Sequence, residues 1–193
     1  MRDRLARWTR RRSQPLVVSA IVVVGCFLQA PGRLVRDTKL DLVVEPVGFL
    51  ARTLHLWDPS ASFGQLQNQA VGYLFPIGPY FAIGQTLGIP GWILQRAWFA
   101  LLLLAGLWGA LRVFEALGVG RPGSRVLGAT VYGLSPSILT LVGFQSGAEL
   151  PHALLPWVLL PLVVGAQRGS PRRAAALSGL AIVAMGGVNA AAT

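Results

Sequence analysis

Cysteine, lysine and acidic residues are all scarce in this sequence of 193 residues. Cys26 is the only cysteine and Lys39 the only lysine, and seven acidic residues stand against 17 basic ones. A single cysteine excludes an intramolecular disulfide and a cysteine-based metal site. Charged residues make up 12% of the chain, whereas a typical soluble domain carries about 25%. This scarcity of charge argues against a soluble globular protein.

Sequence motifs of the common nucleotide-dependent and hydrolytic enzymes are also missing. The chain contains no glycine-rich phosphate loop, no G-x-S-x-G, no H-E-x-x-H and no C-x-x-C. Its net charge of +10 does not indicate a nucleic-acid partner, because six of the 17 basic residues lie in the first twelve positions. The others cluster at the ends of apolar runs, as basic residues do beside membrane helices.

Long hydrophobic runs, in contrast, are abundant, and 53% of the residues are hydrophobic. Runs of this length and composition are typical of helices that cross a lipid bilayer. The fold class predicted is therefore all-α integral membrane, with a basic cytoplasmic N-terminus over 1–14 and a signal-anchor that is not cleaved. The spans are predicted over residues 15–31, 92–115, 125–144, 150–167 and 174–193.

The segment 71–90, "VGYLFPIGPYFAIGQTLGIP", decides the predicted orientation of the chain. Its prolines each remove a backbone hydrogen-bond donor, so we interpret it as an interfacial segment and not as a span. The arginine-rich loops 112–125 and 167–173 then face the cytoplasm, as the positive-inside rule requires. This interpretation predicts a multi-pass plasma-membrane protein with a large external loop over 32–91. Because the chain stops inside an apolar run, we expect a longer protein.

The external loop begins with "GRLVRDTKLDLVVEP", in which acids recur every four residues. If 36–46 is helical, Asp37, Asp41 and Glu45 lie on one face. The same stripe is typical of a solvated amphipathic helix, and that alternative stays open. Because Asp37 follows the first span closely, its carboxylate is expected near the lipid headgroups, in reach of a lipid-linked substrate as a general base. Cations that would neutralise a lipid phosphate are Arg33, Arg36, Lys39 and Arg52.

Further along the loop, "LHLWDPSASFGQLQNQA" has a composition suited to sugar binding. An indole covers the face of a sugar, and amides and a carboxylate bond its hydroxyls. An interfacial tryptophan before an Asp-Pro turn explains part of this pattern equally well. The candidates for substrate binding in this stretch are Trp57, Asp58, Gln67 and Asn68.

Three residues outside the loop are weaker candidates for substrate binding. Arg96 opens the second span, where it either extends to the interface or binds a phosphate. Glu149 and His152 lie in the second external loop, on the side of the membrane expected for Asp37. Whether they complete an acceptor site or a divalent-cation site is open from sequence, and the identity of any metal is unknown.

Residues 37–84, from "DTKLDLVVEPVGFLARTLHLWDP" to "FGQLQNQAVGYLFPIGPYFAIG", resemble the first external loop of actinobacterial cell-wall α-(1→3)-arabinofuranosyltransferases. The stretches "QRAWFALLL" and "YGLSPSILTLVGFQSGAELPHALLPWVLLPL" continue the resemblance. The resemblance therefore covers nearly the whole chain, but only the N-terminal part of a family protein.

This resemblance implies a GT-C glycosyltransferase, in which an acid of the first external loop lies at the active site. It implies a decaprenylphosphoryl-arabinose donor and, as acceptor, the arabinan of arabinogalactan and lipoarabinomannan. Carried over by position, Asp37 is the expected catalytic base and Asp41 is the second candidate for that role. Two alternatives remain from the sequence: a transporter or flippase of lipid-linked sugars, and a related lipid-dependent mannosyltransferase.

Overall fold

A computed structural model describes residues 2–37, 39–59, 63–66 and 70–186, and for residues 2–12 and 65 it describes the backbone only. The chain is predominantly helical. Outside the connection between α1 and α5, the helices are α1 (Arg2–Leu28), α5 (Gly91–Leu117), α6 (Pro122–Gly133), α7 (Pro136–Leu141), α8 (Leu150–Arg168) and α9 (Pro171–Ala184). The connection from α1 to α5 holds α2 (Leu40–Val44), α3 (Pro46–Thr53), β1 (Trp57–Asp58), β2 (Gln65–Leu66), the 3₁₀ turn η1 (Ala70–Tyr73) and α4 (Ile77–Thr86). A second 3₁₀ turn, η2 (Ser146–Glu149), precedes α8.

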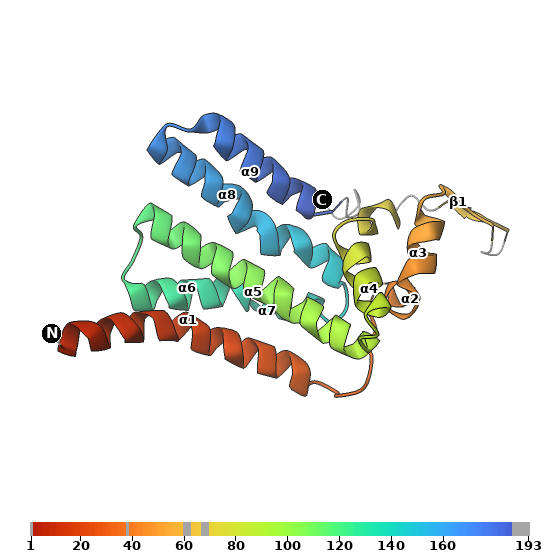
Figure 1. The fold of residues 1–193 in the computed structure, drawn as a ribbon, viewed down its shortest axis with the longest axis horizontal. Coiled ribbons are helices and arrows are strands. Elements are labelled where there is room, and N and C mark those ends of the chain that lie inside the picture. Colours follow the sequence, from red (N-terminus) through yellow and green to blue (C-terminus); the bar gives the residue numbers. More distant parts are fainter. Residues whose placement is uncertain (1, 38, 60–62, 67–69, 187–193) are drawn as a thin grey trace.

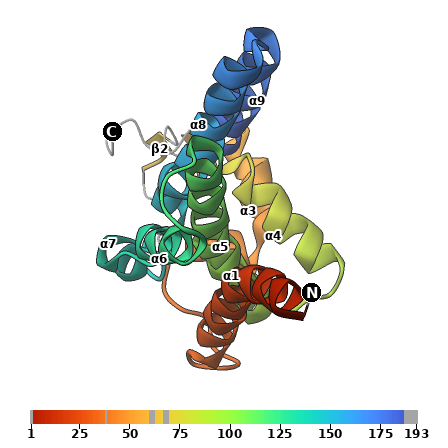
Figure 2. The same ribbon diagram turned by 90° about the vertical axis from the view of Figure 1, so that its left-hand side faces the viewer.

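Helix α5 lies at the centre of the arrangement, with α8 and α9 on one side and α1 on the other (Figures 1 and 2). Side-chain bonds join the layers. Trp108 of α5 donates to Ser19 of α1 at 3.0 Å, and Trp157 of α8 donates to the Ala105 carbonyl of α5 at 2.9 Å. These indole donors are thus satisfied while their rings pack between helices.

Two helical stretches, Gly91–Leu117 and Ser146–Arg168, are long and apolar enough to cross a bilayer. With 27 residues, the first is about 40 Å long, which exceeds the roughly 30 Å of a hydrocarbon core. Together they contain the spans predicted over 92–115 and 150–167. Ser13–Leu28 is a shorter apolar helix that overlaps most of the span predicted over 15–31.

Residues 125–144, predicted to form one span, contain two helices and not one continuous helix. Helix α6 ends at Gly133, and α7 begins at Pro136 after the extended residue Ser135. Ser135 has φ −61° and ψ 149°, the extended conformation that the residue before a proline favours, so the helix is interrupted at this position. In Figure 1 the α6–α7 pair runs opposite to α5 and α8, as α1 and α9 also do.

Residues 71–90 form η1 and α4, which has 10 residues and therefore a length of about 15 Å. Helix α4 packs beside α3 and α5, where Ile77 and Phe81 are buried. Its location at a membrane surface stays a prediction. In the span predicted over 174–193, α9 ends at Ala184, and residues 187–193 lie outside the described part of the chain.

The small elements of the α1–α5 connection gather at one end of the long helices (Figure 1). The N-terminal ends of α5 and α8 lie at this same end, beside η2. Residues far apart in the sequence therefore meet there, and the candidate catalytic acids are among them.

Candidate active site

Asp37 is hydrogen-bonded to Ser146, the first residue of the 3₁₀ turn η2 that precedes α8. The backbone N–H of Ser146 donates a hydrogen bond to one carboxylate oxygen of Asp37 at 3.1 Å, and the Ser146 hydroxyl donates to the other. Ser146 is buried, whereas Asp37 is partly exposed. Two donors on two oxygens fix the rotation of the carboxylate.

The segment before Asp37 is held by α5. Residues 29–37, which we call the linker, contain no helix or strand, and the structure describes all of them. The Gln95 side chain accepts a bond from the Val35 N–H at 2.8 Å and donates to the Val35 carbonyl at 2.7 Å. Arg96 donates to the carbonyls of Gln29, at 3.1 Å, and Arg33, at 3.3 Å.

The acid stripe expected on one helix is not formed. Helix α2 begins at Leu40, so Asp37 precedes it, and Glu45 separates α2 from α3. The short helix ends there because Pro46 follows and cannot donate to it. Asp41 alone of the three acids belongs to α2.

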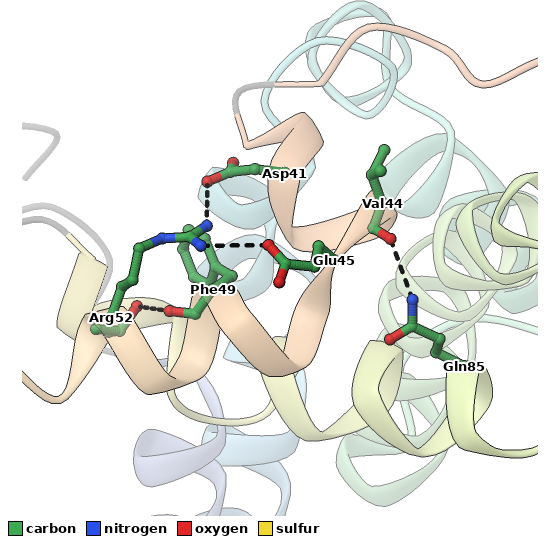
Figure 3. Close-up of polar contacts among 7 residues, drawn as sticks. Asp41, Val44, Glu45, Phe49, Arg52 and Gln85 are labelled. Carbon is green, nitrogen blue, oxygen red and sulfur yellow. Dashed lines mark hydrogen bonds and ion pairs between the residues drawn. The ribbon is translucent and has the colours of Figure 1, made fainter. Parts of the chain in front are cut away.

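Asp41 and Glu45 share one partner, Arg52 of α3 (Figure 3). The guanidinium lies 3.6 Å from Asp41 and 3.2 Å from Glu45, and all three side chains are more than a third exposed. Pairs this exposed contribute roughly 0–1 kcal/mol each to stability. Asp41 and Glu45 therefore share the Arg52 cation, whereas Asp37 is hydrogen-bonded to Ser146.

Tyr73 lies close to both candidate catalytic acids, and sequence reasoning missed it. Burial raises the pKa of the Tyr73 phenol, and the negative charges of Asp37 and Asp41 raise this pKa further. The phenol therefore keeps its proton at neutral pH and remains a hydrogen-bond donor beside two carboxylates. Its ring packs edge-on against Phe49 at 6.0 Å between centroids. In the sequence Tyr73 lies in the apolar segment 71–90, where no pattern indicated a polar role.

Trp57 and Asp58 border an open hollow of about 720 Å³. The two residues form β1, which pairs antiparallel with β2 through Trp57 opposite Leu66. The indole, 56% exposed, rests on Gly64, where an added Cβ would lie 2.1 Å from the ring. The hollow is lined by Arg52, Leu54, His55, Leu56, Trp57, Asp58 and Pro59. Gln67 and Asn68, the other candidates in this stretch, lie outside the described residues.

The candidate phosphate-binding cations have different environments. Arg33 and Arg36 lie in the linker and are exposed. Lys39 lies two residues after the linker and is partly buried. Arg96, in contrast, is fully buried, with its guanidinium bonded to the two linker carbonyls and 5.8 Å from the ring centroid of Phe99. This burial favours a structural role for Arg96 over the predicted contact with a lipid phosphate.

Glu149 and His152 lie near the start of α8, beside Tyr132 of α6. Glu149 is 5% exposed. The imidazole stacks on the Tyr132 ring at 4.3 Å between centroids, and the Tyr132 hydroxyl donates to the His152 carbonyl at 2.7 Å. Among the described residues, no three His, Cys, Asp or Glu side chains come together as metal ligands. The expected divalent cation stays a prediction.

Comparison with known proteins identifies the family. Residues 21–193 match the family model described as alpha-(1->3)-arabinofuranosyltransferase, N-terminal GT-C domain. The chain belongs to this family. The resemblance inferred from the loop motifs is thereby confirmed, and it extends over the helices that follow the loop.

Individual relatives agree with the family model. The chain is 53% identical over 180 residues to the alpha-(1->3)-arabinofuranosyltransferase of Mycobacterium tuberculosis and 52% identical over 179 residues to that of Mycolicibacterium smegmatis. These matches cover 92% of the chain but 13% of each relative, so the chain spans about an eighth of their length.

Solved structures are similar as well. The cryo-electron-microscopy structure of the mycobacterial arabinofuranosyltransferase AftD superposes with a TM-score of 0.86 at 50% identity, over 93% of this chain and 14% of that one. A point mutant of AftD gives a TM-score of 0.87 at 52% identity, with the same coverage. The helical arrangement described above is therefore of the GT-C type.

Proposed function

We propose that the chain forms the N-terminal membrane part of a glycosyltransferase that moves arabinofuranose from a decaprenyl-phosphate donor to cell-wall arabinan. The observation that carries this proposal is the family match over residues 21–193, with relatives that bear the name of this activity. The acceptors would be arabinogalactan and lipoarabinomannan. The proposed arrangement is a multi-span bundle in the plasma membrane, with the α1–α5 connection outside the cell.

Asp37 is the proposed general base of this reaction. Its carboxylate accepts the proton of an acceptor hydroxyl while the hydroxyl oxygen bonds to the anomeric carbon of the donor. The bond from that carbon to the phosphate oxygen breaks, and the lipid phosphate leaves with the electron pair. The support is geometric: two Ser146 donors orient the carboxylate, at the end of the bundle where α5 and α8 begin.

Three cations close to Asp37 in the sequence suit the leaving group. Arg33, Arg36 and Lys39 lie within four residues of this acid. Positive charge close to the breaking bond stabilises the negative charge that develops on the phosphate. We assign these three residues, and not Arg96, to the donor's phosphate.

The hollow beside Trp57 is the proposed place for acceptor sugars. An aromatic platform next to Asp58 and the Arg52 guanidinium offers a flat apolar face bordered by hydrogen-bonding groups. Pockets for small ligands combine these two features. Arg52 also reaches Asp41 and Glu45, so the hollow and the acid region share a side chain (Figure 3).

The test is transfer of arabinose from the polyprenyl-phosphate donor to a short arabinan acceptor, measured with the full-length protein. Asp37→Asn keeps the shape of the side chain but removes the proton acceptor, a change that typically lowers the rate by about 10²–10⁴-fold. Asp41→Asn should cost less, since Asp41 bonds to an exposed arginine. Glu45→Gln should leave the rate nearly unchanged.

Folding of each variant is checked by its thermal unfolding in detergent. A wild-type rate in well-folded Asp37→Asn protein would remove Asp37 from the mechanism. Transfer of mannose, with no transfer of arabinose, would assign a different donor to the same fold. Movement of a lipid-linked sugar across vesicles, without any transfer, would favour a flippase.

A further inference from the structure

Gln95 forms an unusually complete attachment to the linker. Its amide satisfies both the N–H and the carbonyl of Val35, as a neighbouring β-strand would. The side chain is fully buried. Removing it would leave two backbone groups without partners, which is costly in a water-poor environment. The bond pair joins residues 60 positions apart in the sequence.

Arg96 attaches the earlier part of the same linker. It donates to carbonyls on either side of a turn that contains Ala30 and Gly32, both at positive φ. Because residues 29–37 have no bonds of a helix or sheet, these contacts with α5 fix where the linker runs. Gln95 and Arg96 together are called the α5 latch below.

Val35 lies two residues before Asp37, so at most about 7 Å of chain separates their Cα atoms. The carboxylate is held on its other side by Ser146. A change in the position of Val35 is therefore transmitted to Asp37 with little room for compensation. Displacement of a reacting group by about 1 Å is enough to cost 10²-fold in rate.

We propose that Gln95 is a positioning residue for catalysis: by bonding both backbone groups of Val35, it holds Asp37 at the height and angle that proton transfer requires. Arg96 supports the same function through the preceding turn. This inference rests on the proposed function, since it takes Asp37 as the base. Gln95 itself touches no substrate.

The decisive variant is Gln95→Met in the full-length protein, which keeps the length of the side chain and removes both bonds to Val35. The turnover number for arabinose transfer should fall by about 10–100-fold, while the KM values for donor and acceptor stay within twofold. Gln95→Asn carries an amide that is one methylene too short to reach Val35, so it should also lower the turnover number and leave the KM values unchanged. This variant replaces Gln95→Met if Gln95→Met folds poorly.

Two control variants separate positioning from general destabilisation. Gln85→Met makes the same substitution at an exposed amide that donates to the Val44 carbonyl at 3.1 Å, away from the linker. Trp157→Phe removes a bond between α8 and α5. Both should keep the wild-type turnover number. If Gln95→Met loses no more turnover than Trp157→Phe at equal thermal stability, the positioning role is overturned.

A double variant shows whether Gln95 acts through Asp37. If it does, Asp37→Asn with Gln95→Met should be no slower than Asp37→Asn alone, because the positioned group is already gone. Losses that multiply would overturn the inference and leave the proposed function standing. Full activity in Asp37→Asn alone would overturn the proposed function and this inference with it.

Discussion

Trp57 illustrates how a single residue position shapes a binding surface. Its ring is more than half exposed but supported from beneath by Gly64, whose φ of +76° is readily adopted only by glycine. The ring is therefore presented at the hollow in a fixed orientation. A fixed aromatic face loses little entropy when a sugar stacks on it.

Trp57→Ala should raise the KM for the arabinan acceptor by about two- to tenfold, since one aromatic stacking contact contributes about 0.5–1.5 kcal/mol. The turnover number should stay unchanged. Gly64→Ala should act in the same direction, because its Cβ would displace the ring. The measurement is initial rate against acceptor concentration.

Leu54→Ala is the matched control, since Leu54 lines the same hollow and is 72% exposed but has no ring. It should leave the acceptor KM unchanged. Equal KM values for wild type and Trp57→Ala would exclude this hollow as the acceptor site.

The candidate site was predictable from sequence only where a residue type itself carried the signal. Asp37, Trp57 and Asp58 were candidates because acids and aromatics stand out in a chain with so little charge, and their roles stay predictions. Ser146 and Gln95 were missed, because their roles come from partners 109 and 60 residues away. Such contacts are set by packing, and no local pattern encodes them.

At the scale of elements, the close contact between α5 and α6 depends on Gly133, which lies opposite Gly106. Gly133 approaches the backbone of Leu107, and a Cβ there would lie 2.9 Å from the Leu107 nitrogen. At Gly106 a Cβ would find its nearest neighbour, Tyr132, at 3.6 Å, an ordinary contact. Small residues allow helices to pack closely, as they do in membranes.

Gly133→Ala should therefore push α6 away from α5 and destabilise the full-length protein by about 1–3 kcal/mol, as overpacking does. Gly106→Ala should be neutral. The thermal unfolding of both variants in detergent provides the comparison. Equal melting temperatures would mean that α6 shifts without cost.

Element boundaries were predicted well where composition alone decides them. The spans over 92–115 and 150–167 lie inside the observed helices, because a continuous apolar run with few charges has few other structures available in a membrane. Two other boundaries were not indicated by the hydrophobic pattern: α2 begins only at Leu40, and the extended Ser135 separates α6 from α7. The pattern continues across both places, so it does not encode them.

For the whole molecule, the proposed orientation makes a prediction about accessibility. In a Cys26→Ala background, Leu56→Cys should react with a membrane-impermeant thiol reagent in right-side-out vesicles. Gly123→Cys should react only after permeabilisation. Both sites suit labelling, since Leu56 is 65% exposed and an added Cβ at Gly123 has nothing within 4 Å.

The result depends on whether the α1–α5 connection and the α5–α6 loop lie on opposite sides of the membrane. Labelling of Gly123→Cys in intact right-side-out vesicles would reverse the orientation derived from the arginines. Failure of both sites to react before permeabilisation would place the whole α1–α5 connection inside the cell.

The α5 latch has one further consequence, which concerns depth. Gln95 and Arg96 lie about one turn inside a helix of 27 residues, so the linker follows that helix when it tilts or shifts along the membrane normal. In the proposed orientation, the hydrophobic length of α5 therefore determines how far Asp37 lies above the lipid. A bilayer of different thickness would move the acid relative to the donor's headgroup, through a helix that supplies no reacting atom.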